Sequence, residues 1–233
     1  MDLPPCIEAR GLRKSYGKKP ALDGLDLRIP QGRIVGLIGR NGAGKTTALM
    51  AMLGLLRCEG DLRVLGFDPW RERDALVREA FYVADVASMP RWLRVRDALD
   101  YLRAVHPRFD RAKAARLLEQ TEVRDTARVK SLSKGMTAQL HLALALAIDA
   151  KLLVLDEPTL GLDIVHRKRF YDDLREWFAG GRRTVVITTH HAEEVQDVLT
   201  DVIFIDRGRV VLERSMADLG ANSLADLFVA TVG

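Results

Sequence analysis

The sequence predicts an α/β fold, in which a mainly parallel sheet is flanked by helices and carries an N-terminal antiparallel β part and an inserted helical subdomain. Continuous apolar, β-branched runs suit parallel strands covered on both faces, and they occur at residues 33–38, 152–155 and 184–189. Alternating apolar and polar residues near the N-terminus, strict at 25–29, predict half-buried strands. From residue 95 to residue 150, the apolar residues are instead spaced as on one face of a helix.

The other elements follow from the same patterns. Before the first apolar run we expect a strand at 7–12 and a turn at 14–17. After it we expect a helix at 47–53 that closes on Gly54, then strands at 61–66 and 81–84. Three helices are expected next: one from 95 that Pro107 ends, then 111–120 and the uncharged, buried 138–147. The last elements are a helix at 165–178, a hairpin of 202–205 with 210–212, and a helix at 223–229.

From the length of the chain and these changes in residue pattern, we predict a single domain over residues 1–233. Residues 1–85 and 151–233 are expected to form its α/β core. The helical subdomain is expected at about 86–150.

Residues 39–46 match the phosphate-loop pattern G-x-x-x-x-G-K-[ST] at every fixed position, between a predicted strand and a predicted helix. Such a loop directs backbone N–H groups and the positive end of a helix at a phosphate. Lys45 is expected to reach the β- and γ-phosphates, and the Thr46 hydroxyl to ligate Mg²⁺. The predicted nucleotide-binding residues are Gly39, Arg40, Asn41, Gly42, Ala43, Gly44, Lys45, Thr46 and Thr47.

Polar residues follow three further predicted strands: Asp85, the pair Asp156 and Glu157, and His190. Ligands of parallel sheets bind outside the carboxyl ends of the strands, so these side chains are expected near the phosphate loop. Asp156 is expected to hold Mg²⁺, Glu157 to polarise the attacking water as general base, and His190 to contact the γ-phosphate or that water. The alternatives are a helix cap or turn for the carboxylates, and for His190 a satisfied turn histidine or a role taken by His191.

Composition excludes several classes of protein. No apolar run approaches the roughly 20 residues that span a bilayer, and the first residues lack a signal-peptide core. Cys6 and Cys58 give no metal spacing and no disulfide framework, so we expect a cytoplasmic protein. The net charge of +4 is mild, although residues 86–150 hold 12 Lys and Arg against 7 Asp and Glu. That excess is either a solvated surface or an attraction to an acidic partner or a membrane face.

From about residue 7 onward the chain resembles the nucleotide-binding subunits of ABC transporters, because the hallmarks of that family occur in order. Residues 39–46 are similar to the Walker A loop, and 152–157 to Walker B with its catalytic glutamate. Residues 161–163 are similar to the D-loop, and His190 to the switch histidine.

Two more segments carry the resemblance. Residues 132–136, Leu-Ser-Lys-Gly-Met, resemble the signature motif that separates this family from other phosphate-loop ATPases, and Ser133 also suits the cap of a following helix. Tyr16 matches the aromatic that stacks on the base, although a lone tyrosine is more often a packing residue.

The resemblance implies an ATPase that uses ATP and Mg²⁺ and works as a dimer with a second cassette, either a copy of this chain or a related subunit, with two ATP molecules between the two cassettes. Ser133, Lys134 and Gly135 of one subunit would complete in trans the site that Lys45 of the other begins. The second expected partner is a separate transmembrane permease, which would hold the chain at the cytoplasmic face of the membrane; no nucleic acid is expected.

The chain departs from the family pattern at two places. Lys134 and Met136 stand where the commonest signature has Gly and Gln, a form similar to bacterial one-cassette exporter ATPases, so we expect export. No glutamine occurs from 47 to 119, so Asp85 takes the place of the usual metal-sensing glutamine, and it is expected to contribute to the Mg²⁺ site. Met89 and Trp92 follow, where a helix of the permease is expected to dock; core packing is the alternative.

Other functions were weighed against this one. The main alternative is a soluble ABC ATPase that acts on a macromolecular assembly. A regulator without hydrolysis is disfavoured because Glu157 is present, and a phosphotransferase because no acceptor site or lid is evident.

Overall fold

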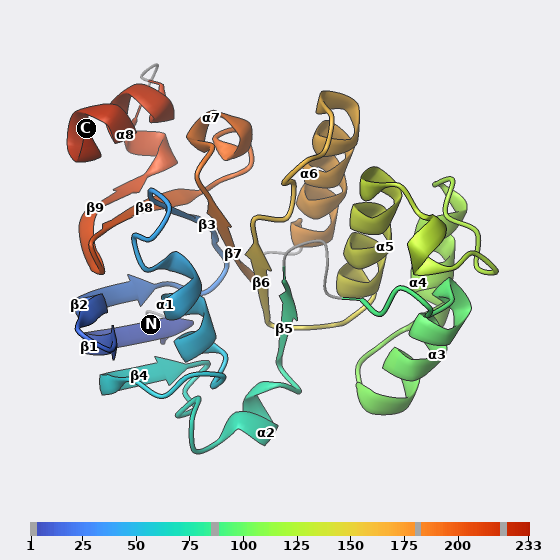
Figure 1. Cartoon of the computed structure of the whole chain (residues 1–233), viewed down its shortest axis with the longest axis horizontal. Helices are drawn as coiled ribbons and strands as arrows, with labels where there is room; N and C mark the ends of the chain where they lie inside the picture. Colours follow the sequence, from blue (N-terminus) through green and yellow to red (C-terminus); the bar gives the residue numbers. More distant parts are fainter. Residues whose placement is uncertain (1–3, 85–88, 180–182, 220–222) are drawn as a thin grey trace.

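Two β-sheets and a group of helices make up the chain, and this computed structural model describes residues 4–84, 89–179, 183–219 and 223–233. The smaller sheet is antiparallel and has the strand order β2-β1-β4. Its strands are β1 (Ile7–Tyr16), β2 (Lys19–Ile29) and β4 (Glu59–Val64). This sheet is the expected N-terminal antiparallel part (Figure 1).

The larger sheet has the strand order β5-β6-β7-β3-β8-β9. Its strands are β3 (Ile34–Ile38), β5 (Ala80–Val83), β6 (Leu152–Asp156), β7 (Thr184–Thr189), β8 (Asp201–Asp206) and β9 (Arg209–Ser215). Neighbours from β5 to β8 are parallel, whereas β8 and β9 form an antiparallel hairpin. Every residue of β3, β6 and β7 is buried, as their unbroken apolar runs predict.

Helix α1 (Lys45–Met52) lies between the two sheets. Its buried Leu49 and Met52 share one core with Leu12 of β1 and Val154 of β6. Burying a side chain of this size stabilises the fold by roughly 1.5–3 kcal/mol. The core therefore fixes the start of α1, and with it the phosphate loop, against both sheets.

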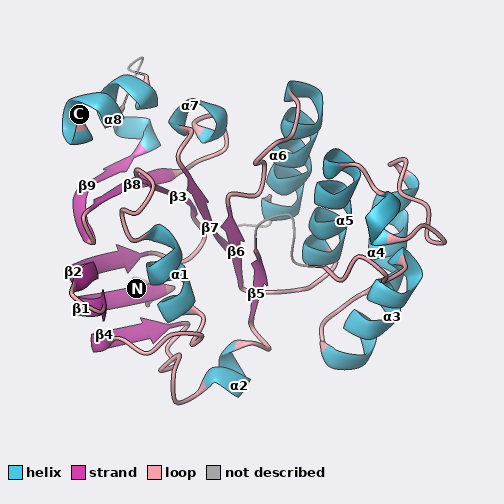
Figure 2. Cartoon of the chain, in the orientation of Figure 1, coloured by secondary structure: helices cyan, strands magenta, loops and turns pink. Residues whose placement is uncertain are grey.

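Helices cover the other face of the larger sheet. They are α6 (Ile164–Phe178), α7 (Ala192–Val195) and α8 (Leu224–Val232). Phe170 and Leu174 of α6 share a second core with Leu155 of β6 and Ile187 of β7. This packing holds α6 beside the carboxyl ends of β6 and β7 (Figure 2).

The remaining main helices are α3 (Val95–Val105), α4 (Arg111–Glu119) and α5 (Lys134–Leu146), and they have a core of their own. Leu99, Leu118 and Leu140 are buried in it. Figure 1 shows these helices together, beyond the β5 edge of the larger sheet. The boundaries of the helical subdomain at residues 86 and 150 stay a prediction.

Three short helical segments complete the chain: α2 (Arg73–Leu76) and 3-10 turns at Val129–Ser131 and Met216–Asp218. Within the described ranges, no helix is both long enough and apolar enough to cross a membrane.

Several boundaries differ from the sequence-based expectation, and two of the differences involve candidate site residues. The turn expected at 14–17 is wrong for residues 14–16, because β1 continues to Tyr16 and pairs with β2 up to Lys19, leaving a two-residue turn that begins at Gly17 with φ of 61°. The helix expected at 138–147 begins earlier, at Lys134, because the Ser133 hydroxyl caps it by accepting from the Met136 N–H at 3.1 Å. Lys134 and Gly135 therefore lie in the first turn of α5 rather than in a loop.

Candidate active site

The phosphate loop runs from the end of β3 to the start of α1, which begins at Lys45. Gly42 and Gly44 have φ of 82° and 109°, values that residues with a side chain rarely adopt. A Cβ on Gly44 would lie 2.4 Å from the Ala21 carbonyl oxygen, and a Cβ on Gly39 would lie 2.4 Å from that of Ile205. The glycines of the motif are thus required by backbone conformation and by close packing.

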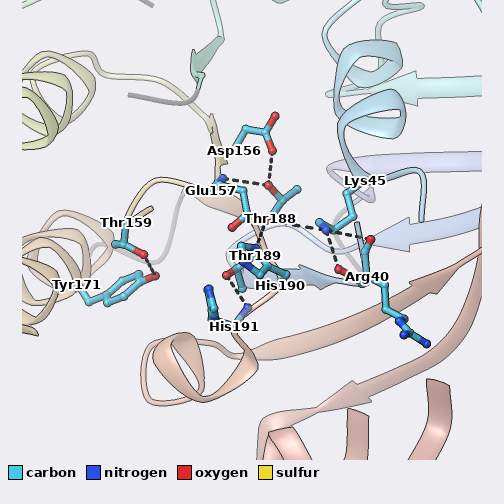
Figure 3. Close-up of polar contacts among 11 residues, drawn as sticks. Arg40, Lys45, Asp156, Glu157, Thr159, Tyr171, Thr188, Thr189, His190 and His191 are labelled. Carbon is cyan, nitrogen blue, oxygen red and sulfur yellow. Dashed lines mark hydrogen bonds and ion pairs between the residues drawn. The ribbon is translucent and has the colours of Figure 1, made fainter. Parts of the chain in front are cut away.

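Lys45 is almost completely buried at this loop. Its Nζ donates hydrogen bonds to the carbonyl oxygens of Gly39 at 2.6 Å and Arg40 at 3.4 Å, and it lies 3.9 Å from Glu157 Oε1 (Figure 3). Burial lowers the pKa of Lys45, and the carboxylates of Glu157 and Asp156 offset part of that effect. The ammonium is therefore a desolvated cation that attracts anions strongly.

The two carboxylates lie at the end of β6. Asp156 Oδ1 accepts a hydrogen bond from the Thr188 hydroxyl at 2.5 Å, and its Oδ2 accepts one from the Tyr82 hydroxyl at 3.3 Å. The Glu157 N–H donates to the Thr188 hydroxyl and carbonyl oxygens, both at 3.1 Å. A single threonine on β7 thus holds both acidic residues.

Glu157 has a φ of 48°, which is unusual for a residue with a side chain. Its Oε1 lies 2.9 Å from His190 Nδ1, and since a carboxylate only accepts, Nδ1–H donates. Of the two adjacent histidines, His190 is the one bonded to Glu157 (Figure 3). His191 is exposed, and its ring packs against the ring of His190. The strained turn at Glu157 thus places its side chain between Lys45 and His190.

A cavity of about 340 Å³ opens beside the loop. The loop residues 40–47 and Glu157 line it, together with Tyr16, Lys19, Pro20 and Ala21 of the β1–β2 hairpin. Tyr16 is 53% exposed, with Lys14 Nζ 5.9 Å from the centre of its ring. Its ring is therefore available to a ligand at the edge of the cavity.

The groups at this site suit Mg²⁺, which prefers hydroxyl, carboxylate, phosphate and water oxygens. Asp156 is buried with its carboxylate held in place, and Thr46 is exposed at the start of α1. Among the described residues, no three His, Cys, Asp or Glu side chains could hold a metal ion by themselves. In phosphoryl-transfer sites Mg²⁺ is usually bound by one or two carboxylates together with substrate phosphates and water.

The signature residues are not brought to the phosphate loop of the same chain. Ser133 caps α5, and Lys134 and Gly135 lie in its first turn. Figure 1 shows α5 and α1 on opposite sides of the strands β5 and β6. This separation fits a contribution to a second chain.

Two predicted features remain, Asp85 and the pair Met89 and Trp92. Asp85 lies outside the described residues. Trp92 is 72% exposed, whereas Met89 is partly buried against the core of α3–α5. Of this pair, the tryptophan is the one whose side chain faces solvent.

Sequence reasoning missed three residues at the site. Thr188 stands opposite Asp156 in the parallel register of β6 and β7, and Tyr82 stands opposite Val154 in the register of β5 and β6. Lys19 is paired with Tyr16 across the hairpin. Strand order and register, which no local pattern contains, would have been needed to find them.

The family profile described as "ABC transporter" matches residues 22–160. The chain is 38% identical over 227 residues to a daunorubicin resistance ATP-binding protein of Streptomyces coeruleorubidus, covering 95% of this chain and 72% of that protein. It is 36% identical over 230 residues to the Nod factor export ATP-binding protein I of Paraburkholderia xenovorans, covering 94% and 74%. It spans 66% of a daunorubicin/doxorubicin resistance ATP-binding protein of Streptomyces peucetius, at 34% identity over 220 residues and 92% of this chain.

Solved structures share the fold. An ATP-binding subunit of an ABC transporter superposes with a TM-score of 0.87 at 23% identity, covering 98% of this chain and 100% of that one. A dimeric ATP-binding cassette bound to ADP and Pi superposes with a TM-score of 0.80 at 21% identity, covering 90% and 98%. With these matches to sequence and fold, the chain belongs to the ABC transporter family, among its ATP-binding proteins.

Proposed function

We propose that this chain binds and hydrolyses ATP and thereby powers a separate membrane permease. The observation that carries the proposal is the position of Glu157, whose Oε1 lies 2.9 Å from His190 and 3.9 Å from Lys45 at the cavity of the phosphate loop. A base, an orienting histidine and a buried cation beside a phosphate cradle are the groups that ATP hydrolysis requires.

Each group has a distinct task in this proposal. Glu157 accepts the proton of the attacking water, and His190 holds the Glu157 carboxylate and contacts the γ-phosphate or that water. Lys45 and the N–H groups of residues 40–46 bind the β- and γ-phosphates, while Tyr16 stacks on the base. Thr46, Asp156 and Asp85 would hold Mg²⁺, which neutralises charge on the phosphate oxygens.

Catalysis in this proposal needs two chains. Ser133, Lys134 and Gly135 lie at the N-terminal end of α5, where N–H groups and the helix dipole attract an anion. Their helix α5 lies on the opposite side of β5 and β6 from α1, so in this proposal they contact the γ-phosphate bound by a partner. A single chain is therefore expected to be almost inactive.

The proposed transport direction is export, and the proposed location is the cytoplasmic face of the membrane, reached through the permease. The relatives support this, because one is a Nod factor export ATP-binding protein and others are daunorubicin resistance ATP-binding proteins. The exposed Trp92 supports a contact with the permease next to α3.

The test compares the wild type with Glu157→Gln, with Glu122→Gln as a matched control on an exposed turn. Phosphate release is measured together with the oligomeric state in ATP. Glu157→Gln is expected to lower turnover by about 100- to 1000-fold, within the usual effect of a general base, and to yield a stable ATP-bound dimer. Turnover that survives intact would overturn the proposed role of Glu157.

The permease is tested separately, by pull-down of the tagged protein from detergent-solubilised membranes with and without ATP. We expect a polytopic membrane protein that raises ATP turnover when the two are reconstituted. Ribosomes or an assembly scaffold in its place would contradict the transport role while leaving the ATPase role intact.

A further inference from the structure

His166, in the first turn of α6, joins two segments of the chain. Its Nδ1 lies 2.7 Å from Asp163 Oδ2, and its backbone N–H donates to Asp163 Oδ1 at 2.9 Å. The opposite edge of the ring faces Gly135: a Cβ added there would lie 3.1 Å from His166 Cδ2 and 3.2 Å from Nε2. One imidazole thus bridges the carboxylate of Asp163 and the backbone of Gly135.

A second contact joins the same two segments. The side chain of Lys134 runs past Gly161, where an added Cβ would lie 3.4 Å from Lys134 Cδ and 3.5 Å from Nζ. We name residues 133–135 the signature segment and residues 161–163 the D-loop segment. The signature segment therefore rests on the D-loop segment at Gly161 and, through His166, at Asp163.

The Asp163 carboxylate is well suited to anchor the imidazole. Hydrogen bonds from the backbone and ring of His166 lower the pKa of Asp163. The His166 side chain is 38% exposed, so the pair is accessible to solvent but fixed at both ends. The ring can move only if it gives up either the carboxylate or the contact with Gly135.

The D-loop segment also belongs to the catalytic side of the chain. It follows Glu157 closely in the sequence, and Asp163 caps α6, whose Tyr171 hydroxyl lies 3.2 Å from that of Thr159 in the same connection. The connection between Glu157 and α6 therefore has two fixed points before it meets the signature segment.

We propose that His166 is a positioning residue, which locks the signature segment onto the D-loop segment so that Ser133, Lys134 and Gly135 are presented together to the partner chain. The inference rests on the proposed ATP-bound dimer. It assigns to His166 no contact with nucleotide: the residue acts through Gly135 on one side and Asp163 on the other.

The test uses the Glu157→Gln protein, in which ATP is expected to hold the dimer. His166→Ala removes both contacts, whereas His166→Asn places an amide nitrogen close to the position of Nδ1 and keeps the bond to Asp163. Lys168→Ala is the matched control, because Lys168 is exposed on α6 two residues further along. The dissociation constant of the dimer in ATP is measured by analytical ultracentrifugation.

We expect His166→Ala to weaken the dimer about tenfold, because the signature segment loses its link to Asp163 and must be ordered when the two chains associate. His166→Asn is expected to recover part of that loss. Lys168→Ala is expected to leave the dissociation constant at the value of the Glu157→Gln protein. The affinity of the monomer for a fluorescent ATP analogue is expected to stay unchanged, because the nucleotide cavity of the same chain does not include His166.

The outcomes separate the inference from the function on which it rests. A dimer as tight with His166→Ala as without it would overturn the inference and leave the proposed function standing. A parallel fall in the affinity of the monomer for the ATP analogue would make His166 a general structural residue and overturn the inference too. Absence of any ATP-dependent dimer from the Glu157→Gln protein itself would contradict the proposed function, and the inference with it.

Discussion

The Nδ1 atom of His190 lies 2.9 Å from Oε1 of Glu157, although the two residues are far apart in the sequence. They meet because β6 and β7 are adjacent and parallel, with Asp156 opposite Thr188. The residues that follow these strands consequently emerge at the same edge of the sheet. The geometry distinguishes His190 from His191, a choice that the sequence left open.

His190→Ala is expected to lower ATP turnover by about 100-fold, because Glu157 loses the group that orients its carboxylate. ATP binding is expected to change little, since Lys45 and the loop remain. Steady-state phosphate release and equilibrium nucleotide binding measure the two effects. His191→Ala is the control, and a larger loss of turnover from it than from His190→Ala would reverse the assignment.

Lys45→Ala is expected to abolish tight nucleotide binding, because it removes the buried cation that would face the phosphates. Lys18→Ala, an exposed neighbour of the cavity on the hairpin turn, serves as the control. Isothermal titration calorimetry with ATP measures the affinity of both variants. Unchanged affinity in the Lys45 variant would remove the phosphate-loop assignment.

Thr188→Val is expected to lower both turnover and the free energy of unfolding, since the methyl group cannot donate to Asp156 or accept from Glu157. A lost hydrogen bond to a buried charge costs roughly 1.5–3 kcal/mol. Urea unfolding and phosphate release measure the two effects. Thr188→Ser keeps the hydroxyl and is expected to stay close to wild type; equal losses in both variants would show that the methyl group matters instead.

Asp85→Asn is expected to weaken Mg²⁺ binding, so that turnover needs a higher free Mg²⁺ concentration, because a neutral amide replaces a proposed carboxylate ligand. Turnover is measured as a function of free Mg²⁺ concentration. Asp74→Asn, at an exposed helical position, is the control. A Mg²⁺ profile identical to the wild type would reduce Asp85 to a structural turn residue.

Cys6 gives a prediction about pH and stability. Burial raises the pKa of the Cys6 thiol from 9.0 to about 11, and a hydrogen bond with Thr184 opposes the shift. Because the folded-state pKa is the higher one, the contribution of the neutral thiol to stability is complete below pH 9.0 and is lost as pH rises towards 11. The free energy of unfolding is therefore expected to fall less steeply over this range in Cys6→Ala than in the wild type. Equal slopes of the free energy of unfolding against pH in the two proteins would contradict the raised pKa of Cys6.

The sequence alone determined the class of fold and the chemistry of the loop. Apolar runs mark β3, β6 and β7 because a strand buried on both faces needs no polar residue. The phosphate loop could equally be recognised, because the left-handed backbone at Gly44 and the lack of space at Gly39 and Gly44 leave little choice of residue at these fixed positions of the pattern. A local backbone conformation of this kind restricts the residue types of one short segment, so it can be recognised from consecutive residues.

Only the tertiary structure decided which side chains meet. Strand order and register brought Thr188 to Asp156 and His190 to Glu157, and the packing of α5 on α6 brought Gly135 to His166. The extension of β1 through Tyr16 likewise depended on pairing with β2. The physical reason is that these contacts join residues far apart in the chain, and their energies arise only once the core has fixed the strands and helices against one another.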